Sequence, residues 1–402
     1  MDNRVYAVRC SDYGQSEERL VELVEMMGGM GAFVREGETI ALKANLLRAG
    51  APEEAVSTHP AVVSAVARMV KKQGAEPVIV DSPGAGFRFT RKVLTRIYQA
   101  CGMSEAADES GAGLNFDTTF EVVFFPEGKL IKRFEIITPI LKSDGVLNLC
   151  KLKSHTFTAM TGAVKNHFGV IPGLAKPGYH AKLMDTSRFA NMLLDLMGIV
   201  SSRLSIMDAV LAMEGDGPSG GDPREVGLFL GATNPLALDV VAGEIIGLPR
   251  EMNPVLMEAE KRGMTPTRMN QVELLGSDIS GLRCPDFRLP GTLCQGTGFS
   301  DHLTWWQRPL QPLFKDSLTQ KPRISRKKCT ACGACLQACP MKAISMAKYR
   351  GKPHALIDEE KCIRCYCCHE MCSDDAVILR RSLLYRFANR QKTCRAKSRS
   401  QA

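Results

Sequence analysis

The chain has 402 residues, a formal net charge of +9 and 45% hydrophobic residues. It is long enough for more than one domain and apolar enough for a sizeable core. The first residues show no basic start followed by a long apolar core, and no apolar run reaches the length of a membrane span. We therefore expect neither a secretory signal nor a transmembrane helix, and we predict a cytoplasmic protein.

The first three-quarters of the chain alternates short β-prone runs with helical stretches. This alternation predicts an α/β domain with a mainly parallel sheet over residues 1–283. In such sheets ligands bind in the loops that follow the carboxyl ends of the strands. Strands are predicted at 5–9, 39–44, 77–80, 121–125, 145–149, 204–207, 227–231 and 272–275, and helices at 17–27, 60–73, 188–200 and 236–246.

The rest of the chain differs in composition. Residues 284–322 lack clear periodicity and contain Trp305 and Trp306, so we interpret them as a linker packed on the surface by its aromatic side chains. Residues 323–380 contain an internal repeat of two cysteine groups, each followed by a β-prone run, which predicts a small α+β domain. Residues 381–402 are rich in basic residues and contain no acidic ones. We interpret them as a solvated tail or as a docking arm for an acidic partner. No platform of interleaved aromatic residues accompanies the tail, which argues against nucleic acid.

Eight of the fifteen cysteines lie in two groups with the same spacing, C-x2-C-x2-C-x3-C. A [4Fe–4S] cluster needs four thiolates, of which three come from one group and the fourth from the other. A zinc site normally uses two pairs of ligands separated by a longer loop, which this pattern does not match. The spacing therefore predicts two [4Fe–4S] clusters and a role in electron transfer. One cluster is assigned to Cys329, Cys332, Cys335 and Cys372, and the other to Cys362, Cys365, Cys368 and Cys339.

Over its whole length this module resembles bacterial two-cluster ferredoxins. It departs from that family at Ser373, where the family usually has proline. Cys367 is an extra thiol inside the second motif, either a bystander or an alternative ligand. Basic residues around the motifs would offset cluster charge or steer an electron-transfer partner protein; a solvated surface is the other interpretation.

A second unusual segment follows the predicted strand 145–149. It places His155, Lys165 and His180 among threonines and glycines, together with Asn166 and His167. Lysine and histidine supply positive charge and proton transfer, and glycine permits close approach of the backbone to a ligand. We predict a ligand site with His155, Lys165 and His180 as catalytic candidates. A structural loop with a solvated lysine is the alternative.

Four acidic residues are further candidates for binding a polar substrate or a metal. Asp208, Glu214 and Asp216 lie in and beside a glycine-rich stretch after the predicted strand 204–207, and Asp81 follows the strand 77–80. The same composition is common in plain turns, so both interpretations stay open. Neither a phosphate-binding P-loop nor the dinucleotide-binding glycine pattern is present.

These motifs resemble domain-of-unknown-function family 362. The resemblance rests on residues 153–173, on the Asp81-Ser-Pro-Gly and Met213-Glu-Gly-Asp-Gly-Pro runs, and on residues 234–239. It extends from about residue 5 to 379, because many members carry a C-terminal two-cluster ferredoxin module. The resemblance implies this architecture without supplying a reaction.

The same segment more faintly resembles the lactate racemase family. That resemblance implies a nickel-pincer nucleotide tethered to Lys165, with His155 in proton transfer and His180 as a metal ligand. The run Gly-Ala-Val-Lys departs from the Gly-Gly-rich run of that family.

The leading hypothesis is a cytoplasmic iron–sulfur oxidoreductase. Its ferredoxin module would exchange electrons with a redox partner protein and with an unknown small molecule in the N-terminal domain. The alternatives are a non-catalytic electron-transfer protein that docks a partner enzyme, and a metal- or pincer-dependent isomerase with an accessory redox module. Whether the protein is an enzyme, its substrate and its oligomeric state stay open from the sequence.

Overall fold

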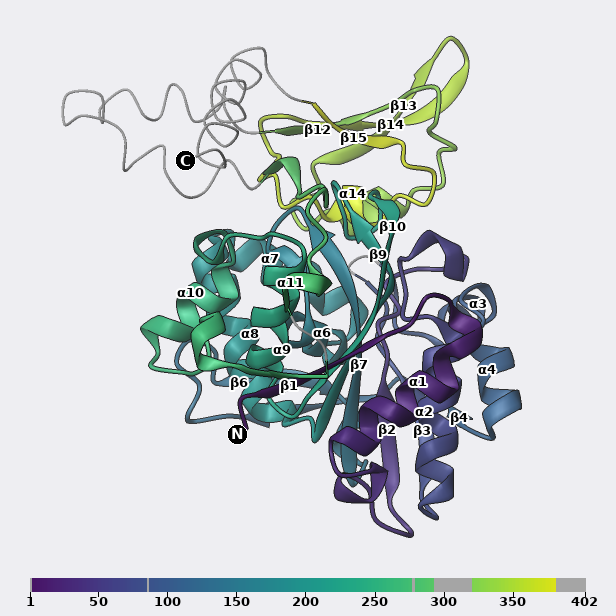
Figure 1. Cartoon of the computed structure of the whole chain (residues 1–402). Coiled ribbons are helices and arrows are strands. Elements are labelled where there is room, and N and C mark those ends of the chain that lie inside the picture. Colours follow the sequence, from purple (N-terminus) through teal and green to yellow (C-terminus); the bar gives the residue numbers. More distant parts are fainter. Residues whose placement is uncertain (1, 85–86, 277–278, 293–319, 381–402) are drawn as a thin grey trace, which may run out of the picture.

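The computed structural model describes residues 2–84, 87–276, 279–292 and 320–380. Residues 2–292 form an α/β domain around one large sheet, and residues 320–380 form a small module at one end of that sheet (Figure 1). Trp305 and Trp306 of the predicted linker and the whole predicted basic tail lie outside the described residues, whereas Phe287 at the start of that linker is buried in the core of the α/β domain.

The sheet is mixed and mostly parallel, as predicted. Its order is β11-β1-β10-β9-β7-β2-β3-β4, and β8 pairs with β7. The strands β9, β7, β2, β3 and β4 run parallel, whereas β10 is antiparallel to both β9 and β1. The bounds are β1 (Arg4–Arg9), β2 (Thr39–Lys43), β3 (Glu76–Val80), β4 (Gly113–Leu114), β7 (Gly145–His155), β8 (Ala159–Thr161), β9 (Leu204–Glu214), β10 (Asp222–Ala232) and β11 (Glu273–Leu275).

Helices cover both faces of the sheet (Figure 1). One face packs against α1 (Ser16–Met26), α2 (Pro60–Lys72), α3 (Arg91–Ala100) and α4 (Met103–Ser110). The other packs against α8 (Thr186–Val200), α9 (Pro235–Ile245) and α10 (Pro254–Lys261). Successive strand residues point to opposite faces, so Leu147 and Leu149 join the first core, while Cys150 and Leu152 join the second. The four predicted helices are all present.

Two central strands are longer than predicted. The sequence suggested that β7 ends at residue 149 and β9 at 207, with loops beyond. Instead each strand has 11 residues, because β7 continues to pair with β9 and then with β8. As a result Lys151, Lys153 and His155 are buried strand residues on one face of β7, and Asp208 lies within β9 rather than in a loop.

The smaller elements complete the architecture. A separate hairpin joins β5 (Phe120–Phe124) and β6 (Arg133–Ile137). In the C-terminal module β12 (Lys321–Ile324) pairs with β15 (Val377–Arg380), and β13 (Ile344–Tyr349) pairs with β14 (Lys352–Ile357). Two short helices, α13 (Ala334–Ala338) and α14 (Cys367–Glu370), follow the cysteine loops. This small α+β module agrees with the prediction, although β12 and β14 were not foreseen.

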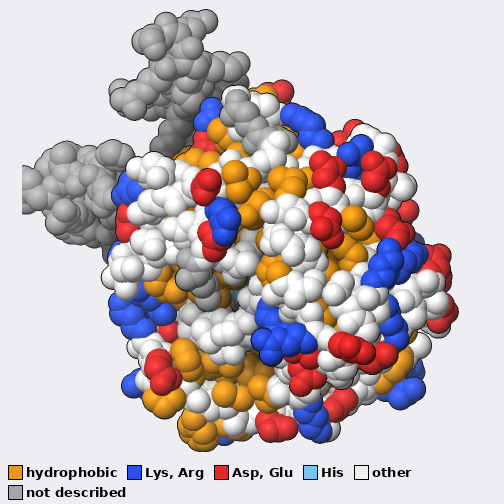
Figure 2. Space-filling model, turned by 60° about the horizontal axis from the view of Figure 1, so that its bottom comes forward, with side chains coloured by type: hydrophobic (Ala, Val, Ile, Leu, Met, Phe, Trp, Pro, Cys, Tyr) orange, Lys and Arg blue, Asp and Glu red, His pale blue; other side chains and the backbone are white. Residues whose placement is uncertain are grey.

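The surface shows mixed charge on the face seen in Figure 2. Acidic and basic side chains are interspersed there with scattered apolar ones, so the net positive charge is not gathered on this face. In the described ranges, no helix is both long and apolar enough to cross a membrane.

Candidate functional site

The two halves of the C-terminal module repeat one backbone conformation. Ala331 and Gly333 have positive φ in the first cysteine loop, and Arg364 and Tyr366 have positive φ at the equivalent positions of the second. Residues other than glycine rarely adopt this left-handed conformation. Its recurrence at matched positions shows that the surrounding fold imposes the same turn around each group of thiols.

The thiol that ends each motif is held in the same way in both halves. Cys339 Sγ accepts a hydrogen bond from the Ala343 N–H at 3.2 Å, and Cys372 Sγ accepts one from the Ala376 N–H at 3.1 Å. Hydrogen bonds to sulfur stabilise the thiolate form that an iron–sulfur cluster requires.

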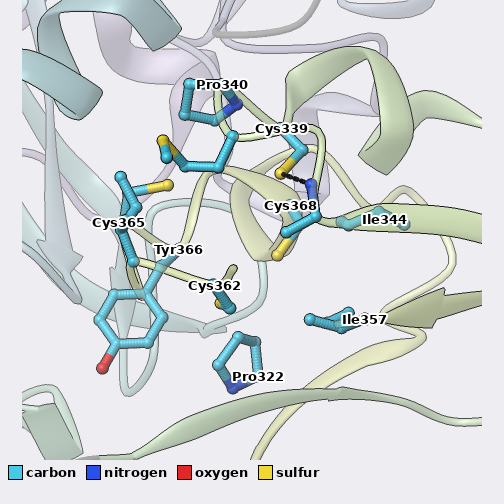
Figure 3. Close-up of a pocket in the computed structure, with 12 residues that line it drawn as sticks. Pro322, Cys339, Pro340, Ile344, Ile357, Cys362, Cys365, Tyr366 and Cys368 are labelled. Atoms are coloured by element: carbon cyan, nitrogen blue, oxygen red, sulfur yellow. Dashed lines mark hydrogen bonds between the residues drawn. The ribbon is translucent and has the colours of Figure 1, made fainter. Parts of the chain in front are cut away.

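Four of the predicted ligands line one pocket. A pocket with about 330 Å³ of empty space, open solvent included, is lined by Cys362, Cys365 and Cys368 of the second motif and by Cys339 of the first (Figure 3).

The other set is also close together. Burial raises the pKa of Cys335 to about 11, with contributions from the neighbouring thiols of Cys332, Cys372 and Cys329.

The donor set consists of thiols, the ligands that iron–sulfur clusters use. All eight predicted ligands are free cysteines. When bound, such clusters supply one-electron transfer.

The module is docked on the α/β domain through α14. Ser219 Oγ donates a hydrogen bond to the Glu370 carbonyl at 2.6 Å, and His369 Nε2 lies 2.9 Å from the Asp216 carbonyl oxygen. Phe87 of the α/β domain packs against the apolar cluster that contains Met371. These contacts place the second cysteine motif over the carboxyl ends of β7 and β9, where a ligand site of the sheet is expected (Figure 1).

His155, the last residue of β7, faces this docked helix. Its Nδ1 accepts hydrogen bonds from the backbone N–H groups of Phe157 at 3.0 Å and Thr158 at 3.4 Å. The neutral ring therefore carries its proton on Nε2, which lies 3.4 Å from Glu370 Oε1. Both atoms are buried and neither has a hydrogen-bond partner. Burial, followed by the charge of Lys165, lowers the pKa of His155 well below its usual value.

The position of Lys165 depends on a capped helix. Lys165 lies on α6 (Ala163–Asn166), whose first N–H groups donate to the Asp239 carboxylate: that of Ala163 at 2.6 Å and that of Val164 at 3.1 Å. A Cβ on Gly162 would lie 2.0 Å from Asp239 Oδ1, so only glycine permits this approach. Two of the segments grouped as family motifs, residues 153–173 and 234–239, thus together support Lys165.

Lys165 is enclosed by other ionisable groups. Within the described ranges its ammonium group has no hydrogen bond or salt bridge, and its Nζ lies 6.0 Å from the centroid of the Phe168 ring. Burial lowers the pKa of Lys165, while Glu370 and then Cys367 act in the opposite direction. Part of its surface nevertheless stays accessible, so it borders a space that a water-sized molecule can reach.

His180, on α7 (Lys176–Lys182), completes the predicted trio. Its ring stacks on Phe189 with centroids 4.6 Å apart, and its Nδ1 is buried without a hydrogen-bond partner. Burial and the nearby Lys165 lower the pKa of His180 to about 3. The structure therefore brings His155, Lys165 and His180 together. His167, in contrast, lies next to Ser202, with Nε2 3.2 Å from Oγ.

Two residues of the site escaped the sequence reasoning. Glu370 lies inside the second cysteine motif, and no local signal connected it with a segment about 200 residues earlier. Lys153 precedes His155 by two residues, which places both side chains on one face once the segment is known to be a strand. Its ammonium group donates to Asn45 Oδ1 at 2.8 Å and to the Val56 carbonyl at 2.6 Å. We call His155, Lys165, His180, Glu370 and Lys153 the Lys165 site.

The four candidate acids do not join this site. Each is bound to a structural partner instead, and they do not form a common group, so the described residues give no support for a metal site among them. Asp81 pairs with Lys43 at 2.8 Å, Asp208 with Lys151 at 2.7 Å and Glu214 with Arg288 at 2.8 Å, while Asp216 Oδ1 accepts from the Gly291 N–H at 2.8 Å.

Comparison with known proteins finds one family model for each part of the molecule, the α/β domain and the iron–sulfur module. Residues 40–244 match the model described as "Domain of unknown function (DUF362)", and residues 328–376 match the model described as "4Fe-4S dicluster domain". The first match covers more than half of the chain, so the protein belongs to the DUF362 family. Both resemblances expected from the motifs are confirmed.

Two curated relatives match the chain over different lengths. A "Thylakoid-associated protein" of Synechocystis sp. is 35% identical over 252 residues, which is 61% of this chain and 74% of that protein. One component of the H(2):CoB-CoM heterodisulfide,ferredoxin reductase of Methanothermobacter marburgensis is 37% identical over 79 residues, or 16% of this chain. The chain spans only 12% of that second relative.

Among solved structures, the lactate racemase apoprotein from Thermoanaerobacterium thermosaccharolyticum aligns with a TM-score of 0.38 and 12% identity. The alignment covers 62% of this chain and 58% of the racemase, and it carries no argument about function.

Proposed function

We propose that the protein is an iron–sulfur oxidoreductase whose ferredoxin module exchanges electrons with a small molecule bound in the Lys165 site. One observation carries this proposal. Glu370, which belongs to the second cysteine motif, reaches into the α/β domain and lies 3.4 Å from His155 Nε2. The loop that would bind a cluster therefore also forms one wall of the Lys165 site.

The arrangement of the cysteines supports a direction for electron passage. In the first set Cys332 is exposed, whereas in the second motif Cys368 is buried and Cys365 packs beside Cys367 in the apolar cluster that Phe87 of the α/β domain also contacts. The first cluster would thus be accessible to a redox partner protein and the second would lie next to the site. The exposed Lys327 and Lys328 favour a partner with an acidic surface.

The chain's own groups would handle charge and protons. The Nε2–H of His155 points into the site and can donate to a bound oxygen atom, and the Lys165 ammonium group can stabilise negative charge that develops there. Aromatic rings of Phe157, Phe168 and Phe189 surround His180 and limit access of water.

For the location we propose a reducing compartment, the cytoplasm. All cysteines in the described ranges are free, as expected where disulfides do not persist. The Synechocystis relative is named for association with thylakoids, which is compatible with a protein bound to the cytoplasmic side of a membrane through a partner.

The test follows reoxidation of the clusters. Anaerobically purified full-length protein is reduced with dithionite, freed of excess reductant, and mixed with the small-molecule fraction of its native cell while cluster absorbance is recorded. Wild type and the exposed-lysine control Lys182→Ala should reoxidise at a saturable rate. Lys165→Ala, with the same iron content, should be slower by at least about 100-fold, the usual contribution of a group that transfers or stabilises a proton.

Equal reoxidation rates in the wild type and Lys165→Ala would refute the proposal and favour the non-catalytic docking role. Intact mass of the native protein tests the pincer alternative in the same preparation. An unmodified Lys165 would exclude it.

A further inference from the structure

The hairpin of β5 and β6 has an edge without a neighbouring strand. Among the described residues, β5 pairs with β6 alone. Phe125, directly after β5, donates its N–H to the Lys132 carbonyl at 2.9 Å, so the odd-numbered residues of β5 bond to β6. Because alternate residues of an antiparallel strand bond to opposite sides, the N–H and C=O groups of Phe120, Val122 and Phe124 point away from β6. They are free to pair with another strand.

The side chains of the same three residues form an exposed apolar strip. Phe120, Val122 and Phe124 are 49%, 39% and 72% exposed and share one face of the strand, while Val123 on the opposite face packs on the core. Folded proteins usually protect such an edge with a lysine, a proline or a bulge. The strand β5 has no lysine or proline, and its pairing with β6 has no register shift. The apolar strip and the free backbone edge therefore belong to one interaction surface.

We infer that β5 pairs in antiparallel fashion with β5 of a second copy of this chain, in a register centred on Val122. The outward backbone groups of Val122 then meet those of the partner's Val122, and those of Phe120 meet those of the partner's Phe124. Aromatic and β-branched pairs of this kind stabilise antiparallel sheets. A two-fold axis at position 122 makes the two halves of the contact identical, as in most homodimers. The inference does not rest on the proposed function.

The charges of the hairpin permit this contact. Glu121 is the one charged residue of β5, and in this register it lies opposite the partner's Val123, so like charges do not stand directly opposite each other. On β6, Arg133 and Glu135 are the cross-strand partners of the apolar strip. They give the contact an apolar centre flanked by charges of both signs, as at other protein interfaces. One short strand from each copy makes a small interface, so we expect dissociation in the micromolar range.

The test is anaerobic sedimentation velocity of the cluster-loaded full chain over a dilution series from about 1 to about 100 µM. The wild type should shift from monomer to dimer. So should the control Leu356→Lys, which adds the same charge at an exposed apolar residue of the C-terminal module. Val122→Lys and Val122→Glu should each raise the dissociation constant at least about tenfold, because two added like charges would stand opposite each other on the two-fold axis.

An equimolar mixture of Val122→Lys and Val122→Glu should form dimers again, since opposite charges then meet at the axis. This recovery is specific to a register in which position 122 faces itself. Val122→Pro tests the backbone contribution separately. The Val122 N–H does not bond to β6, so proline should leave the hairpin folded and remove an outward donor. This variant should keep the iron content of the wild type and dimerise at least about tenfold more weakly.

Three results would each overturn the inference. The first is a wild type that stays monomeric at the highest concentration. The second is a Val122→Lys or Val122→Pro variant that dimerises as tightly as the wild type. The third is a mixture of the two charged variants, each with the melting temperature of the wild type, that stays monomeric.

Discussion

Asp239 should make the stability of this protein depend on pH in a way that a single substitution removes. The carboxylate is buried in α9 and accepts the hydrogen bonds that begin α6. Burial raises its pKa from 3.8 to about 7, although the two N–H groups act against this. The folded chain therefore holds a proton on Asp239 at pH values where the unfolded chain has lost it.

The sign and size follow from proton linkage. A carboxyl whose pKa is raised by folding contributes fully to the free energy of unfolding at pH values below its pKa in the unfolded chain. This contribution is lost as the pH rises through its pKa in the folded chain. One pH unit with one proton of difference corresponds to about 1.4 kcal/mol. Between pH 5 and pH 7 the free energy of unfolding should fall by about 2 kcal/mol through this group alone.

Asp239→Asn cannot titrate and should lack this slope. The amide oxygen replaces only one acceptor, so the variant should also lose about 1–3 kcal/mol for the buried N–H left unpaired. Anaerobic urea unfolding of both proteins at pH 5, 6 and 7 measures the two effects separately. If the difference in unfolding free energy between wild type and Asp239→Asn is the same at all three pH values, then the carboxyl does not titrate as argued.

Three other outcomes test the support of the site. Gly162→Ala should lower the free energy of unfolding by about 1–3 kcal/mol, because its Cβ collides with the carboxylate that caps α6. In thermal unfolding the melting temperature should fall for this variant. It should not fall for Gly178→Ala, whose Cβ has no neighbour within 4 Å. Asp208→Asn should lower the free energy of unfolding by about 3–5 kcal/mol, since it leaves the buried Lys151 ammonium without its counter-charge. The double variant with Lys151→Met should regain part of this free energy. An unchanged free energy of unfolding in Asp208→Asn alone would contradict the argument. Cys367→Ala should retain about eight iron atoms per chain, as expected for two [4Fe–4S] clusters without this thiol; metal analysis that finds about half would make Cys367 a ligand.

Much of the fold follows from local pattern. Amphipathic spacing and end signals predict α1, α2, α8 and α9 to within two residues, and the cysteine spacing predicts which thiols share a pocket. These features depend on neighbours in the sequence. The strand pairing of β10, which runs against its neighbours, has no such signal.

The site was harder to predict, because the partner of each charged side chain comes from a distant part of the sequence. The sequence grouped Asp208 with Glu214 and Asp216 as one loop, yet each binds a partner from another element. Polar residues such as Lys153 looked like loop residues because they interrupt the apolar pattern of a buried strand. Only the tertiary structure shows that Asn45 and the Val56 carbonyl satisfy that lysine inside the sheet.

The position of α14 links cofactor assembly to the state of the Lys165 site. This helix lies between the predicted cluster ligands Cys365 and Cys372 and carries Glu370, so the loop that encloses a cluster also covers His155. The contacts of α14 with Ser219 and Asp216 hold this cover, and predicted cluster ligands flank it on both sides. We therefore expect cluster binding and the cover of His155 to depend on each other, because both use the same helix.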